Sequence, residues 1–176
     1  MSERAGLLGF AAFSGVGKTT LLTRLIPTLR ARGLRVAVVK HAHHEFDIDY
    51  PGKDSYRLRE AGADQVLIAS KRRWALICET PQAQDDPDLH ALLQHFNETE
   101  LDLILVEGFR NIAFPKIELH RPALGQPLMC LADASIVAVA TDGALAEDVR
   151  IPILDLNNPT AIAEFIVSSV LQDTRH

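Results

Sequence analysis

The stretch AFSGVGKTTL, from Ala12 to Leu21, contains the residue types that bind phosphate. It matches the phosphate-loop pattern G-x-x-x-x-G-K-[ST] at Gly17, Lys18 and Thr19, whereas Ala12 takes the place of the first glycine. In such a loop, backbone N–H groups surround the phosphate oxygens, the lysine contacts the β- and γ-phosphates, and the threonine hydroxyl binds Mg²⁺. Alanine fits the first position if the backbone φ there is ordinary. The stretch therefore predicts a nucleotide site, with a tight turn and a solvated lysine as the alternative.

An acidic partner for the magnesium ion is predicted from the apolar run LILVEG. Glu107 ends this run, and Gly108 after it lets the backbone turn sharply. A strand-end carboxylate beside a phosphate loop holds Mg²⁺ directly or through water, so Thr19 and Glu107 are the expected metal-binding pair. Asp102 is a weaker candidate because it begins the strand. The alternative for Glu107 is a solvated strand end.

The polar stretch KHAHHEFDIDYPGKDS follows the second predicted strand, at the edge where a parallel sheet binds ligands. Imidazoles in its His41–His44 segment and carboxylates such as that of Asp47 are donors for transition metals. Their spacing matches no zinc signature, so a loop that senses nucleotide or partner is favoured over a dedicated metal site, with a mobile polar loop as the simplest alternative. Lys40 and Lys53 either add positive charge near the phosphates or are solvated.

Two later strands end in carboxylates that can read a base. VATDG contains Asp142 and LDLNN contains Asp155. A carboxylate accepts two hydrogen bonds from the N1–H and 2-amino groups of guanine, a donor pair that adenine lacks. We therefore expect guanine, with Asp142 as the contact and Asp155 as its rival. An Asp-Gly turn that holds no ligand remains the alternative.

The predicted site contains nucleotide contacts and metal ligands but no assigned catalytic residue, because no general base is evident near Lys18. The expected nucleotide-binding residues are Ser14, Gly15, Val16, Gly17, Lys18, Thr19, Thr20, Lys40 and Asp142, and the expected metal-binding residues are Thr19, Glu107 and Asp47. Arg110 is a further candidate for phosphate contact.

These residues need strands that carry them to one edge of a sheet. Apolar runs at residues 7–13, 34–41, 101–109 and 135–142 predict buried strands, and residues 18–32 predict a helix with a kink or a break at Pro27. Residues 54–63 predict a short helix capped by Asp54 or Ser55, and DQVLIAS and WALICET predict a hairpin. The first strand, helix and second strand predict a right-handed βαβ unit, and the whole chain, residues 1–176, a single α/β domain.

Composition excludes several classes of protein. The chain has 176 residues, 47% of them hydrophobic, which suits one globular domain with a substantial core. Its net charge of -5 argues against nucleic-acid binding. No apolar run approaches the ~18 residues of a membrane span, and the N-terminal run leads directly into the phosphate loop, so we expect a cytoplasmic protein without a cleaved signal peptide. Cys78 and Cys130 are expected to be buried, reduced thiols.

The motifs together resemble the MobB family of molybdopterin-guanine dinucleotide biosynthesis adapter proteins. The resemblance is carried by FAAFSGVGKTTLL, VVKHAHHEFDIDYPGKDSYRLREAGA, RRWALICET and LDLILVEGF, and it covers nearly the whole chain. The second stretch is long and unusual, so the resemblance is more specific than a phosphate loop alone. The family also tolerates alanine at the first glycine of the loop.

The resemblance implies a P-loop NTPase-like three-layer sandwich with a mostly parallel sheet, assembled as a homodimer that binds GTP and Mg²⁺. It also implies that the protein assists the molybdenum cofactor guanylyltransferase, which joins GMP to molybdopterin, with at most slow GTP hydrolysis of its own and with molybdopterin as a second candidate partner. Two alternatives remain open. One is a P-loop small-metabolite kinase with His41 or Asp47 as base, and the other is a metal-insertion GTPase that uses the His41–His44 loop.

Overall fold

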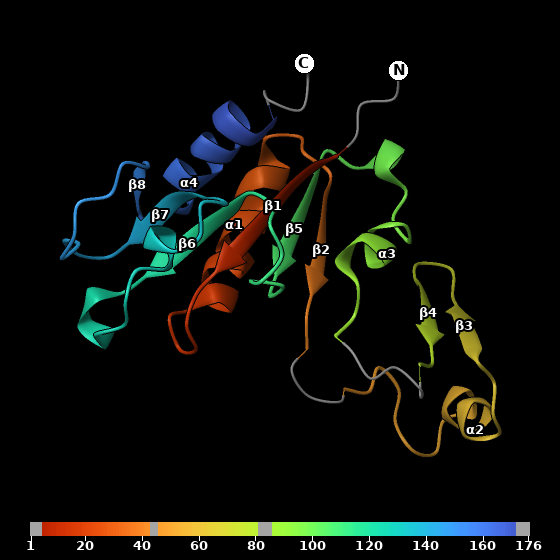
Figure 1. The fold of residues 1–176 in the computed structure, drawn as a ribbon. Helices are drawn as coiled ribbons and strands as arrows, with labels where there is room; N and C mark the ends of the chain where they lie inside the picture. The colour runs from red at the N-terminus through yellow and green to blue at the C-terminus, as the bar shows by residue number, and fades with distance from the viewer. Residues whose placement is uncertain (1–4, 43–45, 81–85, 172–176) are drawn as a thin grey trace. The chain divides into compact units, whose positions relative to one another are not determined.

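The computed structural model describes residues 5–42, 46–80 and 86–171 (Figure 1). The described residues form two compact units, one within Met1–His41 and Leu93–His176 and the other within Ala42–Leu92. Among the described residues, no helix is long and apolar enough to cross a membrane.

The larger unit contains a six-stranded sheet in the order β2-β5-β1-β6-β7-β8, and every neighbouring pair in it is parallel. Its strands are β1 (Gly6–Ala11), β2 (Val36–Lys40), β5 (Leu103–Glu107), β6 (Lys116–His120), β7 (Ile136–Thr141) and β8 (Ile153–Asp155). The predicted α/β class with a mostly parallel sheet is therefore confirmed. The expected strand–helix–strand unit is present, but β5 lies between β1 and β2 in the sheet.

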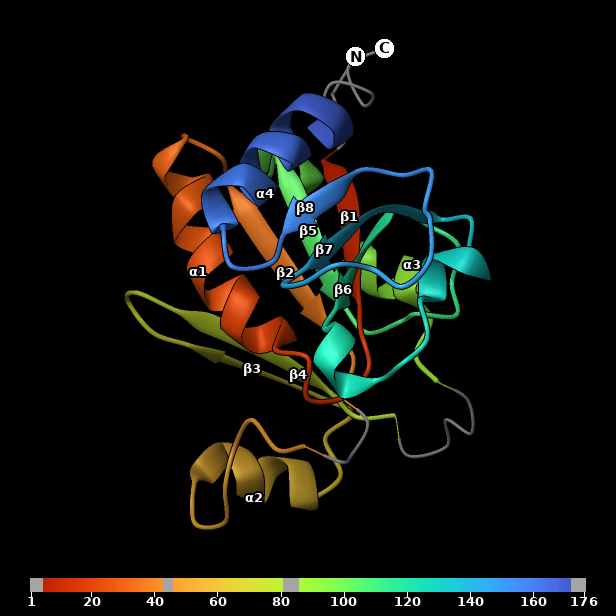
Figure 2. The ribbon, with the colours of Figure 1, turned by 90° about the vertical axis from the view of Figure 1, so that its left-hand side faces the viewer.

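Two helices pack side by side on one face of this sheet, α1 (Lys18–Ala31) and α4 (Pro159–Phe165), the latter continued by a π-helical turn at Ile166–Val170 (Figure 2). Alternate side chains of the central strands bury themselves against these helices because a strand points successive residues to opposite faces. The core between sheet and helices includes Leu8, Phe10, Leu25, Leu29, Leu105, Ile117, Ile162 and Ile166. Burial of these apolar side chains holds the carboxyl ends of the strands in a fixed array. Short 3₁₀ turns occur at Glu98–Glu100, Pro122–Leu124 and Met129–Leu131.

Of the kink or break expected at Pro27, the break is wrong, because α1 runs continuously through this residue, and the kink stays a prediction. Proline removes one helix hydrogen bond, and the carbonyl freed is that of Thr23, four residues earlier. Both residues are exposed, and an exposed helix carbonyl can bind water in place of the lost N–H. Meanwhile the buried Leu25 and Leu29 hold the helix against the sheet.

The smaller unit contains the helix α2 (Asp54–Glu60) and an antiparallel pair of strands, β3 (Gln65–Ala69) and β4 (Trp74–Cys78). The predicted hairpin is therefore confirmed, and the N–H of Ser70 donates to the carbonyl of Arg73 across its turn. The α2 cap was wrongly expected at Asp54 or Ser55. The capping position is Lys53, and Asp54 lies in the first turn, where its carboxylate interacts favourably with the positive end of the helix dipole.

One short helix, α3 (Leu89–Leu93), spans the boundary between the two units. Of the two cysteines, both of which are free thiols, Cys130 is half-buried and Cys78 is exposed. The expectation that both are buried is thus wrong. The reason is that Cys78 ends a hairpin strand whose side chains on that face are exposed.

Candidate functional site

The stretch between β1 and α1 has the backbone geometry of a phosphate loop. Gly15 and Gly17 adopt left-handed conformations with φ of 81° and 105°, which favour glycine. Ala12 does not, since Phe109 is the one non-glycine residue with positive φ among those described. Gly17 directly precedes α1, so the first N–H groups of that helix, which have no partner within it, point toward the loop.

The loop side chains divide into one buried anchor and several exposed polar groups. Val16 is 3% exposed and belongs to the core, whereas Ser14, Thr19 and Thr20 are exposed. The Lys18 ammonium donates to the carbonyl of Ala12 at 3.3 Å, and so extends back across the loop. The anchor fixes the loop from below and leaves hydroxyl, ammonium and N–H groups available to an anion.

The sheet brings two further predicted residues to the same edge. Glu107 ends β5 and is aligned with Phe10 of β1 on one side and with Lys40 of β2 on the other. The Lys40 ammonium lies 3.8 Å from the Glu107 carboxylate, a long ion pair whose lysine side chain is 60% exposed and whose glutamate side chain is 14% exposed. A half-buried carboxylate therefore lies at the end of the strand beside β1, which leads into the loop.

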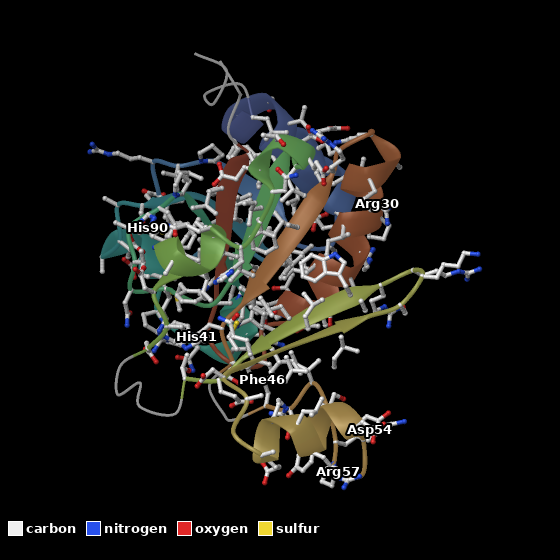
Figure 3. The ribbon with its side chains drawn as sticks, turned by 90° about the vertical axis from the view of Figure 1, so that its right-hand side faces the viewer. Arg30, His41, Phe46, Asp54, Arg57 and His90 are labelled. Atoms are coloured by element: carbon white, nitrogen blue, oxygen red, sulfur yellow. The ribbon has the colours of Figure 1, made fainter. Side chains whose placement is uncertain are left out.

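The backbone turns sharply after Glu107, as expected. Gly108 has φ of 96°, and Phe109 follows with φ of 52°. A Cβ atom on Gly108 would lie 2.6 Å from Cβ of His41, so the close approach of the two backbones requires glycine. His41 lies at the carboxyl end of β2 (Figure 3). Its ring stacks on the Phe109 ring, with 4.8 Å between the ring centroids. The remaining histidines of the predicted loop, His43 and His44, lie outside the described residues.

The segment after this turn is held by a buried lysine. Lys116 is 1% exposed, and its ammonium donates to the carbonyl of Ile112 at 2.6 Å and to that of Arg110 at 3.3 Å. It also pairs with Asp133 at 3.0 Å. Burial raises the pKa of Asp133, but hydrogen bonds from Ser135 and the pairing with Lys116 outweigh burial and hold this pKa below its usual value. Asp133 is thus ionised at neutral pH and balances the buried ammonium.

Asp142 is tied to the phosphate loop through an arginine that sequence reasoning missed. Arg121 follows β6, and its Nη1 donates to the Asp142 carboxylate at the end of β7. Its Nε donates to the carbonyl of Val16 at 2.8 Å. The available signal was a basic residue at the end of KIELHR, a short stretch in which polar and apolar residues alternate as in a strand.

The other carboxylates at strand ends are engaged locally. Asp155 is paired in register with Thr141 on the neighbouring strand, and its Oδ1 accepts the N–H of Asn157 at 2.8 Å. Asp102, at the opposite end of β5 from Glu107, forms an ion pair with Arg35, in keeping with its rank as a weak candidate.

Two predicted residues of the polar stretch lie in the smaller unit. Asp47 pairs with Nη2 of Arg59 at 2.6 Å, and the same guanidinium pairs with Glu79 at 2.7 Å. Lys53 lies over the ring of Tyr50. Asp54 and Arg57 project from α2 in the same unit (Figure 3). Among the described parts of the chain, no three histidine, cysteine or acidic side chains are placed to share a metal ion.

Comparison with known proteins shows the family of this chain. Residues 7–142 match the family model MobB, described as molybdopterin guanine dinucleotide synthesis protein B. The chain is 49% identical over 162 residues to the molybdopterin-guanine dinucleotide biosynthesis adapter protein of Escherichia coli (strain K12), a match that covers 92% of this chain and 91% of the relative. It is 46% identical over 166 residues to the adapter protein of the same name from Haemophilus influenzae, with coverage of 94% and 90%.

A solved structure supports the same relationship at the level of the fold. The crystal structure of a molybdopterin-guanine biosynthesis protein B is similar with a TM-score of 0.71 and 30% sequence identity, covering 92% of this chain and 98% of the other. The predicted P-loop NTPase-like α/β fold is therefore confirmed, with its helices flanking a parallel sheet.

Proposed function

This chain belongs to the MobB family of molybdopterin guanine dinucleotide synthesis proteins, and we propose that it serves there as an adapter that binds GTP with Mg²⁺. In this proposal the adapter assists the guanylyltransferase that joins GMP to molybdopterin. Hydrolysis of GTP by the adapter itself is slow at most, and no residue is assigned a catalytic role.

The phosphate loop is the observation that carries the proposal. Two left-handed glycines, a helix N-terminus and the Lys18 ammonium converge on one short stretch. The loop glycines and the helix N-terminus present backbone N–H groups to an anion, and the helix dipole adds partial positive charge there. The Lys18 ammonium adds a full positive charge. A nucleoside triphosphate supplies the negative charge that this combination accommodates.

A magnesium ion fits the donors at the same edge. The Thr19 hydroxyl is exposed, and the Glu107 carboxylate is half-buried and forms a long ion pair with Lys40. Hydroxyl and carboxylate oxygens are the ligands that Mg²⁺ prefers, together with phosphate oxygens and water. When bound, the ion would offset the charge of the phosphates. Asp47 is retained as a third proposed ligand, although its carboxylate pairs with Arg59.

Guanine is the proposed base, with Asp142 as its contact. Oδ2 of Asp142 accepts the bond from Arg121, and Oδ1 accepts no hydrogen bond from the described residues. A carboxylate with an oxygen open to further hydrogen bonds suits the N1–H and 2-amino donors of guanine. Asp155 also has one oxygen engaged, since its Oδ1 accepts the N–H of Asn157, and it remains the rival contact.

A homodimer is the proposed assembly, and the hairpin of the smaller unit supports it. Leu67 and Trp74 on one face of this two-stranded sheet are 61% and 65% exposed, and Leu76, paired with Leu67, is 37% exposed. An isolated two-stranded sheet is marginally stable in water, so an apolar face of this kind gains from being covered. A second copy of the chain is the proposed cover.

The first test is nucleotide binding by Lys18→Ala, measured by calorimetry with GTP, ATP and GMP in the presence and absence of Mg²⁺. Charge-assisted hydrogen bonds are worth about 1.5–3 kcal/mol each, so loss of the lysine should abolish measurable GTP binding. Arg30→Ala, at the far end of the same helix, is the matched control and should bind GTP like the parent (Figure 3). Unchanged GTP affinity in Lys18→Ala would rule out this loop as the site.

The adapter role needs a separate test. Immobilised protein should retain the guanylyltransferase from a purified mixture, and retention should depend on GTP in the parent but not in Lys18→Ala. Absence of retention under all nucleotide conditions would contradict the adapter role while leaving nucleotide binding intact.

A further inference from the structure

Arg121 occupies a position that links three parts of the nucleotide edge. Its Nε donates to the Val16 carbonyl at 2.8 Å, and its Nη1 donates to the Asp142 carboxylate. Its Nη2 lies 3.7 Å from the point where a Cβ atom on Gly17 would stand. One guanidinium therefore donates to the phosphate loop at Val16, lies beside Gly17 and holds Asp142 at the end of β7.

The contact with Val16 stabilises the loop in a conformation suited to phosphate. Val16 lies between two left-handed glycines, and its side chain is buried. Its carbonyl lies outside the regular hydrogen bonding of any strand or helix. A backbone carbonyl in such a position needs a donor. Because Arg121 supplies one from outside the loop, the loop needs none of its own N–H groups for this carbonyl.

A neutral hydrogen-bond donor would be enough for the Val16 carbonyl. The positive charge of Arg121 therefore matters for its other partner, the Asp142 carboxylate. A carboxylate placed near a triphosphate is repelled by it, and such repulsion favours either protonation or displacement of the carboxylate. An arginine paired with the carboxylate offsets that repulsion. The pair is partly open to solvent, with side-chain exposures of 32% for Arg121 and 25% for Asp142. The Arg121–Asp142 pair therefore contributes little to the free energy of unfolding, and its main effect is to orient the Asp142 carboxylate.

We infer that Arg121 is a positioning residue that determines base selectivity, by fixing the Asp142 carboxylate to the phosphate loop. This inference rests on the proposed GTP site. The planar guanidinium presents its N–H groups in a fixed fork, so the Val16 carbonyl and the Asp142 carboxylate keep a constant relative orientation. A guanine whose phosphates occupy the loop then meets a carboxylate already in place.

The test compares Arg121→Ala, Asp142→Ala and the double variant for binding of GTP, ITP and inorganic tripolyphosphate by calorimetry. ITP lacks the 2-amino group, so the ratio of GTP to ITP affinity reports contact with the Asp142 carboxylate. Each single variant should lose about 10- to 100-fold in GTP affinity and bring the GTP/ITP ratio close to one, and the double variant should lose little more. Tripolyphosphate affinity should change less than about threefold, since charges partly exposed to solvent interact weakly.

Two controls separate positioning from a structural role. Arg121→Lys keeps the charge but not the fork, and should retain tripolyphosphate affinity while the GTP/ITP ratio falls. If Arg121→Ala does not fold, as judged by circular dichroism, this lysine variant carries the test. Arg30→Ala should leave every affinity unchanged.

The outcomes distinguish the inference from the proposal beneath it. A parent protein that binds no GTP overturns both. A parent that binds GTP through Lys18, with Arg121 variants that keep the GTP/ITP ratio, overturns the inference alone. Additive losses in the double variant, or an equal loss for GTP, ITP and tripolyphosphate, would also overturn it, because they would show that Arg121 acts on the phosphates independently of Asp142.

Discussion

Glu107 illustrates how a single side chain at the site can be tested for its role. Its carboxylate lies 3.8 Å from the Lys40 ammonium. Glu107→Gln keeps the shape and one oxygen but removes the charge that would hold Mg²⁺, so the dependence of GTP binding on Mg²⁺ should fall more than GTP binding itself. Calorimetric titrations of GTP with and without Mg²⁺ measure the difference.

Glu164→Gln is the control for this experiment, because Glu164 forms an exposed surface pair with Arg32. Its response to Mg²⁺ should equal that of the parent. If GTP binding by Glu107→Gln responds to Mg²⁺ just as the parent does, then Glu107 is not a partner of the metal.

The residues that could be predicted from the sequence were those whose chemistry is local. Gly15, Gly17 and Lys18 lie within a few positions of one another, and their backbone conformations follow from residue type. Arg121 could not be assigned in this way, because its bond to Val16 joins residues 105 positions apart. That contact depends on which strand lies next to β1, and no local pattern encodes the neighbour.

At the scale of the element, the turn after β5 depends on a single glycine. Gly108 has φ of 96°, and a Cβ atom there would lie 2.6 Å from Cβ of His41. Gly108→Ala therefore combines left-handed strain of about 1–2 kcal/mol with a steric clash, and should lower the free energy of unfolding by more than about 2 kcal/mol. Urea denaturation measures this loss.

Gly33→Ala separates the two contributions. Gly33 has φ of 84° and nothing within 4 Å of its added Cβ, so its substitution reports the backbone strain alone. Equal losses in the two variants would mean that His41 moves aside at no cost, and would contradict the tight packing of β2 against the turn.

The segment after that turn depends on an ion pair whose effect varies with pH. Asp133→Asn leaves the buried Lys116 ammonium without its countercharge, so the free energy of unfolding should fall by about 1–3 kcal/mol at pH 7. The pKa of Asp133 lies below its usual value in the folded protein. Asp133 therefore contributes fully to the free energy of unfolding above its pKa in the unfolded chain, about 3.9. This contribution is lost as the pH falls through its pKa in the folded protein.

Urea denaturation at pH 7, 4 and 3 tests this dependence. The difference between the parent and Asp133→Asn should shrink as the solution becomes acidic. Glu164→Gln, which breaks the exposed pair with Arg32, should cost under about 1 kcal/mol at pH 7. A difference for Asp133→Asn that stays constant down to pH 3 would show that folding does not lower the pKa of this carboxyl.

The elements themselves were largely predictable, because apolar runs and helical spacing are local signals. The sequence could not show that α1 passes through Pro27, since this depends on the sheet beneath Leu25 and Leu29. Nor could it place β5 between β1 and β2, because strand order is set by packing over long separations.

At the scale of the whole molecule, the exposed face of the hairpin is expected to govern assembly. Leu67→Glu places a charge at the centre of that face, opposite Leu76. Burying an unpaired charge is costly, so the variant should be monomeric under conditions in which the parent forms the proposed dimer. Sedimentation velocity measures the assembly state, and circular dichroism confirms that the variant is folded.

Leu124→Glu is the matched control, because Leu124 is a comparably exposed leucine, 46% exposed, in the larger unit. This variant should remain dimeric. A monomeric parent, or a Leu67→Glu variant that still forms dimers, would exclude the hairpin face as the interface.

The position of β5 within the sheet also has a consequence during synthesis on the ribosome. β1 and β2 emerge early, but the strand that joins them, β5, begins only at residue 103. Translation proceeds at about 5–20 residues per second, so roughly 3–13 seconds separate the completion of β2 from that of β5. Throughout that interval the nascent chain presents two apolar strands with unpaired edges, which are sites of aggregation. We therefore expect the first third of the chain to need a chaperone until its middle strand arrives.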